Sequence, residues 1–114
     1  MPKLRAIVKR PDEKYGHMTN ISASLENLQR TVDGYIEAVT CEKFVIVCNE
    51  DGKNLGLAMN MPLGGDVLLG TIIVIGTKGD EFADLAISFD EWKQFVGDQY
   101  ENMVNLLFDR KGRK

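Results

Sequence analysis

The residue types that most often perform catalysis are sparse in this sequence of 114 residues. The single histidine, His17, lies in a polar stretch, where an isolated histidine is more often solvated than catalytic. None of the serines that it could meet (Ser22, Ser24 and Ser88) has the Gly-x-Ser-x-Gly context of a hydrolase nucleophile. We therefore expect no catalytic residues and predict that the protein is not an enzyme.

The two cysteines and the 17 acidic residues form no known metal-binding pattern. Cys41 and Cys48 lack a zinc spacing and a second pair, so we interpret both as small buried side chains. Because their positions differ in parity, they would point to opposite faces of an extended chain. The sequence has no EF-hand, Walker A or dinucleotide-binding pattern, and it predicts neither a metal nor a cofactor.

The segment 60–70 (NMPLGGDVLLG) contains three glycines, and such a segment could present backbone amides to an anion. Asp66 lies inside it, however, and no lysine or arginine follows as in a phosphate-binding loop. The other interpretation is a turn followed by a β-bulge at Gly70. As an alternative function, the segment indicates binding or sequestration of a small nucleotide-like ligand.

The net charge of −3 is divided unevenly along the chain. Residues 15–109 carry a net charge of −10, whereas residues 1–14 carry +3 and residues 110–114 carry +4. An acidic body repels nucleic acid at long range, so we expect no nucleic-acid partner. We interpret residues 110–114 as a basic C-terminal tail.

No apolar run approaches the roughly 18 residues that a transmembrane helix needs. The N-terminal sequence MPKLRAIVKRPDEK also lacks the apolar core of a signal peptide. These features predict a cytoplasmic protein that does not associate with a membrane.

The elements that must position these residues are mainly short strands. Apolar and β-branched runs predict strands at residues 3–9, 35–40, 44–48, 55–59 and 67–76, with a short strand or irregular lead-in at 82–86. Polar or Gly- and Pro-containing stretches predict loops at 12–20, 49–54 and 60–66. In the second of these, Asp51-Gly52 would supply a positive φ angle for a hairpin turn.

Two helices are predicted, each with a start signal. A serine cap precedes a short helix over about 24–33, in which Leu25, Leu28 and Val32 share one face and Gly34 ends the helix. Ser88 and Glu91 form a capping box at the start of a long helix over about 89–108. The apolar stripe of this helix comprises Phe89, Trp92, Val96, Tyr100, Met103 and Leu107.

The order of these elements predicts an α+β fold with a mostly antiparallel sheet of about five strands. We expect residues 1–109 to form a single α+β domain whose helices cover one face of the sheet.

Three segments carry a resemblance to a known family. They are SLENLQRTVDGYIEAV (24–39), VIVCNEDGKNLGLAMN (45–60) and LGGDVLLGTIIVIG (63–76). Together they resemble the uncharacterised family called domain of unknown function 3846, over about residues 24–76. The resemblance implies an origin in a bacterial phage, plasmid or other mobile element. It implies no catalytic residue, cofactor or substrate.

Four polar residues in the resembling segments are candidates for a binding site, because a core does not require them: Gln29, Glu37, Asn60 and Asp66. Their other interpretation is capping of turns and helix ends. Extra apolar residues near the end of the long helix predict a homodimer or a protein partner on Met103, Val104, Leu106 and Phe108. The leading hypothesis is therefore a small accessory protein of a mobile element that binds a macromolecule.

Overall fold

A computed structural model describes residues 2–112 of the chain and the side chains of residues 2–108. The side chains of the predicted basic tail, 110–114, lie outside these described residues. The elements in chain order are β1 (Lys3–Lys9), β2 (His17–Ser22), α1 (Leu25–Val32), β3 (Ile36–Thr40), β4 (Val45–Asn49), α2 (Gly52–Leu55), β5 (Met59–Leu63), β6 (Asp66–Leu69), β7 (Ile72–Lys78), β8 (Glu81–Ala83) and α3 (Phe89–Gly112).

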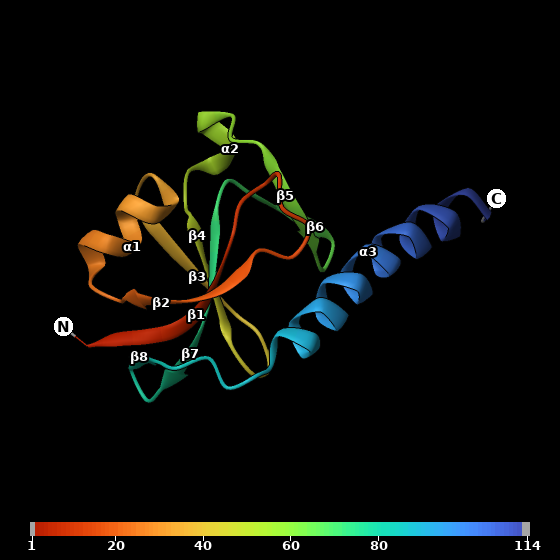
Figure 1. Ribbon diagram of the computed structural model, residues 1–114. Helices are drawn as coiled ribbons and strands as arrows, with labels where there is room; N and C mark the ends of the chain where they lie inside the picture. The colour runs from red at the N-terminus through yellow and green to blue at the C-terminus, as the bar shows by residue number, and fades with distance from the viewer. Residues whose placement is uncertain (1, 113–114) are drawn as a thin grey trace.

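An antiparallel sheet of six strands forms the centre of the molecule (Figure 1). Five strands follow the order β2-β1-β7-β4-β3, and β8 pairs with the C-terminal end of β7. A second sheet consists of the β5–β6 hairpin alone. The predicted α+β class and the antiparallel sheet are confirmed.

Each face of the central sheet has its own cover, because β4 and β7 are apolar on both faces. On one face, Val45 and Val47 pack with Leu28 and Val32 of α1. On the other face, β4 residues pack with the β5–β6 hairpin and with Trp92 of α3. The prediction that the helices cover one face is therefore wrong, since a sheet with two apolar faces needs two layers around it.

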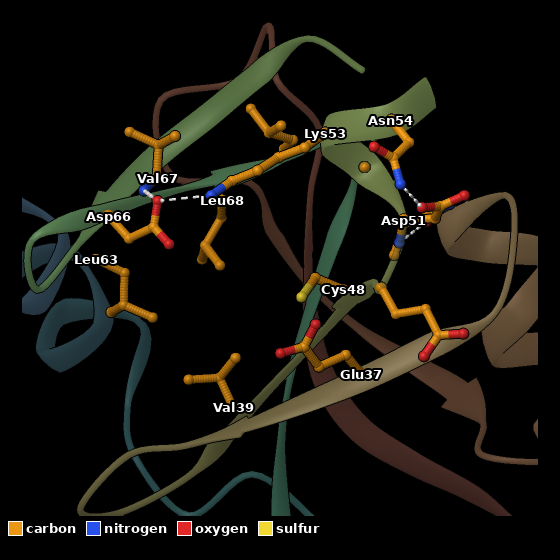
Figure 2. Close-up of a pocket in the computed structure, with 14 residues that line it drawn as sticks. Glu37, Val39, Cys48, Asp51, Lys53, Asn54, Leu63, Asp66, Val67 and Leu68 are labelled. Atoms are coloured by element: carbon orange, nitrogen blue, oxygen red, sulfur yellow. Dashed lines mark hydrogen bonds and ion pairs between the residues drawn. The ribbon is translucent and has the colours of Figure 1, made fainter. Parts of the chain in front are cut away.

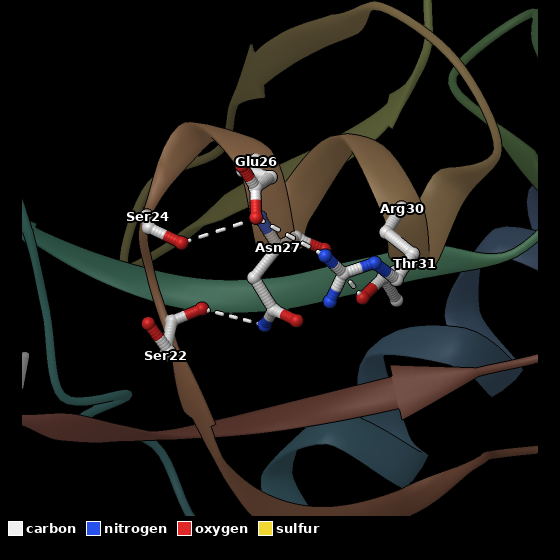
Figure 3. Close-up of polar contacts among 6 residues, drawn as sticks. All are labelled: Ser22, Ser24, Glu26, Asn27, Arg30 and Thr31. Atoms are coloured by element: carbon white, nitrogen blue, oxygen red, sulfur yellow. Dashed lines mark hydrogen bonds and ion pairs between the residues drawn. The ribbon is translucent and has the colours of Figure 1, made fainter.

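Helix α1 begins as predicted, at a serine cap (Figure 3). Ser24 Oγ accepts a hydrogen bond from the Asn27 N–H at 3.2 Å, and Asn27 Nδ2 donates to the Ser22 carbonyl oxygen at 2.7 Å. Leu25 does not share the buried face, because 59% of its surface is exposed. The left-handed residue that ends the helix is Asp33, with φ of 64°, and not Gly34.

Gly34 is needed for a different reason, a close approach of Asn49. A Cβ atom at Gly34 would lie 2.5 Å from Asn49 Nδ2. That amide nitrogen donates to the carbonyl oxygens of Val32 and Asp33, both at 3.1 Å. Asn49 thus caps the C-terminus of α1 from the neighbouring strand β4.

The polar stretch 12–20 is not all loop, since residues from His17 onward form β2. This strand pairs with β1 from Lys3↔Ser22 to Val8↔His17. As an edge strand it has one neighbour and little buried surface, so its sequence lacks the apolar signal of a central strand.

The segment between β4 and β7 differs most from the prediction. The expected turn and return strand are replaced by the short helix α2. This helix ends at Gly56, which has a left-handed conformation with φ of 68°. The expected loop over 60–66 contains β5, including Pro62. Proline is tolerated there because a two-stranded sheet leaves each strand one unpaired edge.

The predicted strand 67–76 is two strands, β6 and β7, separated at Gly70. Gly70 has φ of 78°, and a Cβ atom there would lie 2.8 Å from Leu57 Cδ1. The predicted bulge at Gly70 is therefore wrong, because the glycine turns the chain from one sheet into the other.

Helix α3 begins at the predicted capping box and divides into two halves. Ser88 N–H donates to Glu91 Oε1 at 3.0 Å, and Glu91 N–H donates to Ser88 Oγ at 3.1 Å. In the first half, Trp92 is fully buried and its Nε1 donates to the Tyr15 carbonyl oxygen at 2.8 Å. Its ring contacts Phe44 edge-on, with the ring centroids 5.8 Å apart.

The second half of α3 extends away from the rest of the molecule (Figure 1). The helix continues to Gly112, four residues beyond the predicted end. The molecule accordingly measures 55 × 31 × 26 Å. No helix in the described range 2–112 is long and apolar enough to cross a membrane.

Candidate functional site

A cavity of about 530 Å³ lies between the β3–β4 edge, α2 and the β5–β6 hairpin (Figure 2). Its lining combines apolar and charged side chains. The lining residues are Glu37, Val39, Cys48, Asn49, Glu50, Asp51, Gly52, Lys53, Asn54, Leu63, Asp66, Val67, Leu68 and Leu69.

Strand pairing explains how β3 and β4 contribute to this cavity. Glu37 lies opposite Cys48 in the β3–β4 register. Because side chains alternate along a strand, Val39 lies on the same face as Glu37. The β3–β4 pair therefore supplies a wall in which one carboxylate stands among small apolar groups.

Helix α2 and the hairpin supply the opposite side of the cavity. A Cβ atom at Gly52 would lie 3.2 Å from Leu69 Cβ, which shows how closely α2 packs on β6. Lys53 Nζ lies 3.5 Å from Asp66 Oδ1, and this ion pair joins the two elements. Figure 2 shows the pair on one side of the cavity, with Glu37 and Cys48 on the other.

The charges around the cavity are held in place by backbone and side-chain contacts. Asp66 Oδ1 accepts a hydrogen bond from the Val67 N–H at 2.8 Å. This bond and the Lys53 ammonium hold the pKa of Asp66 below its usual range. On α2, Asn54 Nδ2 donates to Asp51 Oδ1 at 2.6 Å. Both aspartate side chains are therefore held in place at the edge of the cavity.

Cys48 is the buried polarisable group of the wall. Only 6% of its surface is exposed, and burial together with the Glu37 carboxylate raises its pKa to about 11. The expected burial is confirmed for Cys48, whereas Cys41 is only half-buried. Both cysteines pack against the same core cluster, so the expectation of opposite faces is wrong. The chain reverses between β3 and β4, and in their pairing odd-numbered residues of β3 lie opposite even-numbered residues of β4. Positions of different parity can therefore lie on the same face.

The acidic side chains do not gather into a metal centre. In the part of the chain with described side chains, no group of three or more His, Cys, Asp or Glu residues could hold a metal ion. His17 lies away from the cavity lining at the start of β2, where its Nδ1 is 3.5 Å from Glu13 Oε2.

The structure brings together two of the four predicted site residues. Glu37 and Asp66 both line the cavity. Gln29 lies on α1, which covers the opposite face of the sheet. Asn60 is buried, and its Oδ1 accepts a hydrogen bond from Lys9 Nζ at 2.7 Å. Asn60 thus joins the two sheets through its hydrogen bonds with Lys9 and does not line the cavity.

Sequence reasoning did not identify three lining residues that matter here: Cys48, Glu50 and Lys53. Glu50 and Lys53 lie in a segment interpreted as a solvated turn. The four-residue helix α2 carries no periodic signal long enough to detect. The packing of α2 on β6 brings Lys53 within 3.5 Å of Asp66.

A second hollow, of about 240 Å³, lies between the hairpin turn and α3. Gly64 N–H donates to Gln99 Oε1 at 2.8 Å and holds the hairpin against the helix. Of the predicted interface residues, Met103 and Leu106 line this hollow. Val104, Leu106 and Phe108 are 43%, 52% and 67% exposed.

Comparison with known proteins identifies the family of the chain. Neither the curated proteins nor the solved structures contain a match. The family model described as "Domain of unknown function (DUF3846)" matches residues 4–101. This range includes the three segments that suggested the resemblance, both sheets apart from Lys3 of β1, and the first half of α3. The chain therefore belongs to the DUF3846 family.

Proposed function

We propose that this protein is a small cytoplasmic accessory protein that acts by binding a macromolecule and not by catalysis. The surface that supports this proposal is the second half of α3, and the proposed occupant is a second copy of the same chain. An origin in a bacterial phage or plasmid is what the family membership implies, and it forms part of the proposal.

The observation that supports the binding surface is a wide apolar arc on a helix that extends into solvent. With about 100° of rotation per residue, the apolar side chains from Tyr100 to Phe108 cover an arc of about 200°. Between 37% and 67% of the surface of Tyr100, Val104, Leu106, Leu107 and Phe108 is exposed. An exposed arc of this width is typical of a surface that a partner covers.

The charge distribution of α3 favours an antiparallel second copy as that partner. Residues 90–101 contain four acidic side chains and one lysine. By sequence, residues 109–114 contain four basic residues and one acidic residue. Two antiparallel copies would bring the acidic half of one helix beside the basic end of the other, and the contact would be self-complementary.

The alternative of nucleotide-like binding by residues 60–70 has less support. The Gly64 N–H already donates to Gln99 Oε1, so it is not free for an anion. Carboxylates also outnumber cations around the adjoining cavity, where Asp66 pairs with Lys53. A phosphate group would meet repulsion at this place.

Light scattering coupled to size-exclusion chromatography tests the dimer. We expect the wild type to elute with twice the chain mass of 12.8 kDa. The double variant Leu106→Glu/Phe108→Glu should elute as a monomer, because two buried carboxylates would oppose the contact. The matched control is Leu25→Glu, which alters a leucine of similar exposure on α1 and should stay dimeric. A wild type that remains monomeric at high concentration would exclude the second copy as the occupant.

A further inference from the structure

The cavity between β3–β4 and the β5–β6 hairpin is not used by the proposed dimer contact. Its volume of about 530 Å³ lies within the range of small-molecule sites, which is roughly 300 to 1,000 Å³. It is also built from segments distant in sequence, since Glu37 of β3 and Asp66 of β6 both line it.

Both sides of the cavity contribute apolar side chains. Val39 lies on the β3–β4 side, Leu63 and Leu68 lie on the hairpin side, and Leu68 belongs to the buried core. Beside them, Cys48 is more than nine-tenths buried, and Figure 2 shows its sulfur pointing into the cavity. Burial and the Glu37 carboxylate raise the pKa of Cys48 to about 11, so a neutral thiol faces the cavity. This apolar lining suits an aliphatic chain.

The cavity lining carries more negative than positive charge. Four carboxylates line the cavity (Glu37, Glu50, Asp51 and Asp66). The ammonium group that faces them is Lys53, which is 3.5 Å from Asp66. That pair is exposed and therefore weak, so another cation can replace Lys53 beside Asp66. Glu37 stands across the cavity beside Cys48.

We propose that this cavity binds a small aliphatic amine, a linear diamine in particular. The aliphatic stem would lie along Val39, Leu63 and Leu68. One ammonium group would pair with Glu37, and the other would replace Lys53 beside Asp66. This site is separate from the second half of α3 and doesn't depend on the proposed dimer.

Calorimetric titration with cadaverine, a five-carbon diamine, tests the site. We expect saturable binding of one cadaverine per chain and no binding of 1,5-pentanediol, which has the same stem without charge. Glu37→Gln should weaken binding about fivefold, the upper range for a partly exposed ion pair. Lys53→Met should strengthen binding about threefold, because it removes the competing ammonium from Asp66.

The matched control is Asp80→Asn, which removes an exposed carboxylate in the turn between β7 and β8. It should leave cadaverine binding unchanged, and circular dichroism should show that all variants are folded. Equal weakening by Asp80→Asn and Glu37→Gln would overturn the site, because it would indicate general attraction to an acidic protein. Tighter binding of Nα-acetyl-lysine amide than of cadaverine would overturn the free diamine in favour of a protein side chain.

Alkylation of Cys48 gives a second readout at the cavity itself. In a Cys41→Ser chain, Cys48 is the only cysteine. Saturating cadaverine should slow its reaction with iodoacetamide several-fold, because the stem would cover the sulfur. An unchanged rate at saturation would place the amine elsewhere and overturn the proposal.

Discussion

At the scale of single residues, Lys9 and Asn60 form the polar contact that joins the two sheets. Lys9 is 1% exposed, and its Nζ donates to Asn60 Oδ1 at 2.7 Å and to the Asn60 carbonyl oxygen at 3.2 Å. In return, Asn60 Nδ2 donates to the carbonyl oxygens of Lys9 and Gly70 at 2.9 and 2.8 Å. A buried ammonium held only by neutral oxygens keeps its position at an energetic cost.

That cost predicts how stability depends on pH. Burial lowers the pKa of Lys9 from 10.5, and the carboxylates of Glu13 and Asp12 oppose the shift. Between the lowered pKa and 10.5, the unfolded chain binds more protons than the folded chain, so the free energy of unfolding rises with pH. Urea denaturation at pH 7 and pH 10 should show the wild type gaining stability relative to Lys9→Met. A constant difference between the two proteins would contradict a lowered pKa.

At the scale of elements, the end of α1 depends on a contact from another strand. Asn49 of β4 occupies the space that a side chain at residue 34 would need. Its own Oδ1 also accepts a hydrogen bond from the Asp51 N–H at 2.7 Å. The same amide therefore caps α1 and sets the start of the segment that leads into α2.

Gly34→Ala should consequently be destabilising. The new Cβ would lie 2.5 Å from Asn49 Nδ2 and displace a buried amide from its partners. We expect a loss of about 1–3 kcal/mol, the cost of unpaired buried polar groups. The matched control is Gly97→Ala in α3, where nothing lies within 4 Å of the added atom. It should stabilise the protein by about 0.5–1 kcal/mol. Thermal denaturation measures both, and equal effects of the two substitutions would contradict this role of Asn49.

At the scale of the whole molecule, the two halves of α3 differ in their contact with the buried core. The deeply buried residues of α3 are Trp92 and Val96, in its first half. The family match ends at residue 101, before the apolar arc is complete. Core packing therefore depends on the first half of α3, and association is the role proposed for the second half.

A chain that ends at residue 101 should still fold. We expect cooperative unfolding within about 5 °C of the wild-type Tm, which corresponds to about 1 kcal/mol for a domain of this size. In the full chain, Trp92→Ala should cost about 3–5 kcal/mol, because it removes a fully buried ring. Loss of cooperative unfolding in the shortened chain would show that the second half of α3 belongs to the core.

The sequence alone was enough to predict the α+β class, the first strand and the starts of α1 and α3. These features depend on signals that lie within a few residues of one another, such as alternation in Lys3–Lys9 and the Ser88–Glu91 capping box. The sequence also marked Glu37 and Asp66 as candidate site residues. No sequence pattern, however, indicates that the two side chains line the same cavity.

Which surfaces contact one another depends on the tertiary structure. The edge strand β2 is stabilised by pairing with β1. The turn between β6 and β7 requires glycine at position 70, because φ there is 78° and an added Cβ would lie 2.8 Å from Leu57 Cδ1. The cavity exists because α2 and β6 fold back toward Glu37. Such contacts join residues far apart in sequence, and their free energy comes from burial and pairing that no local pattern encodes.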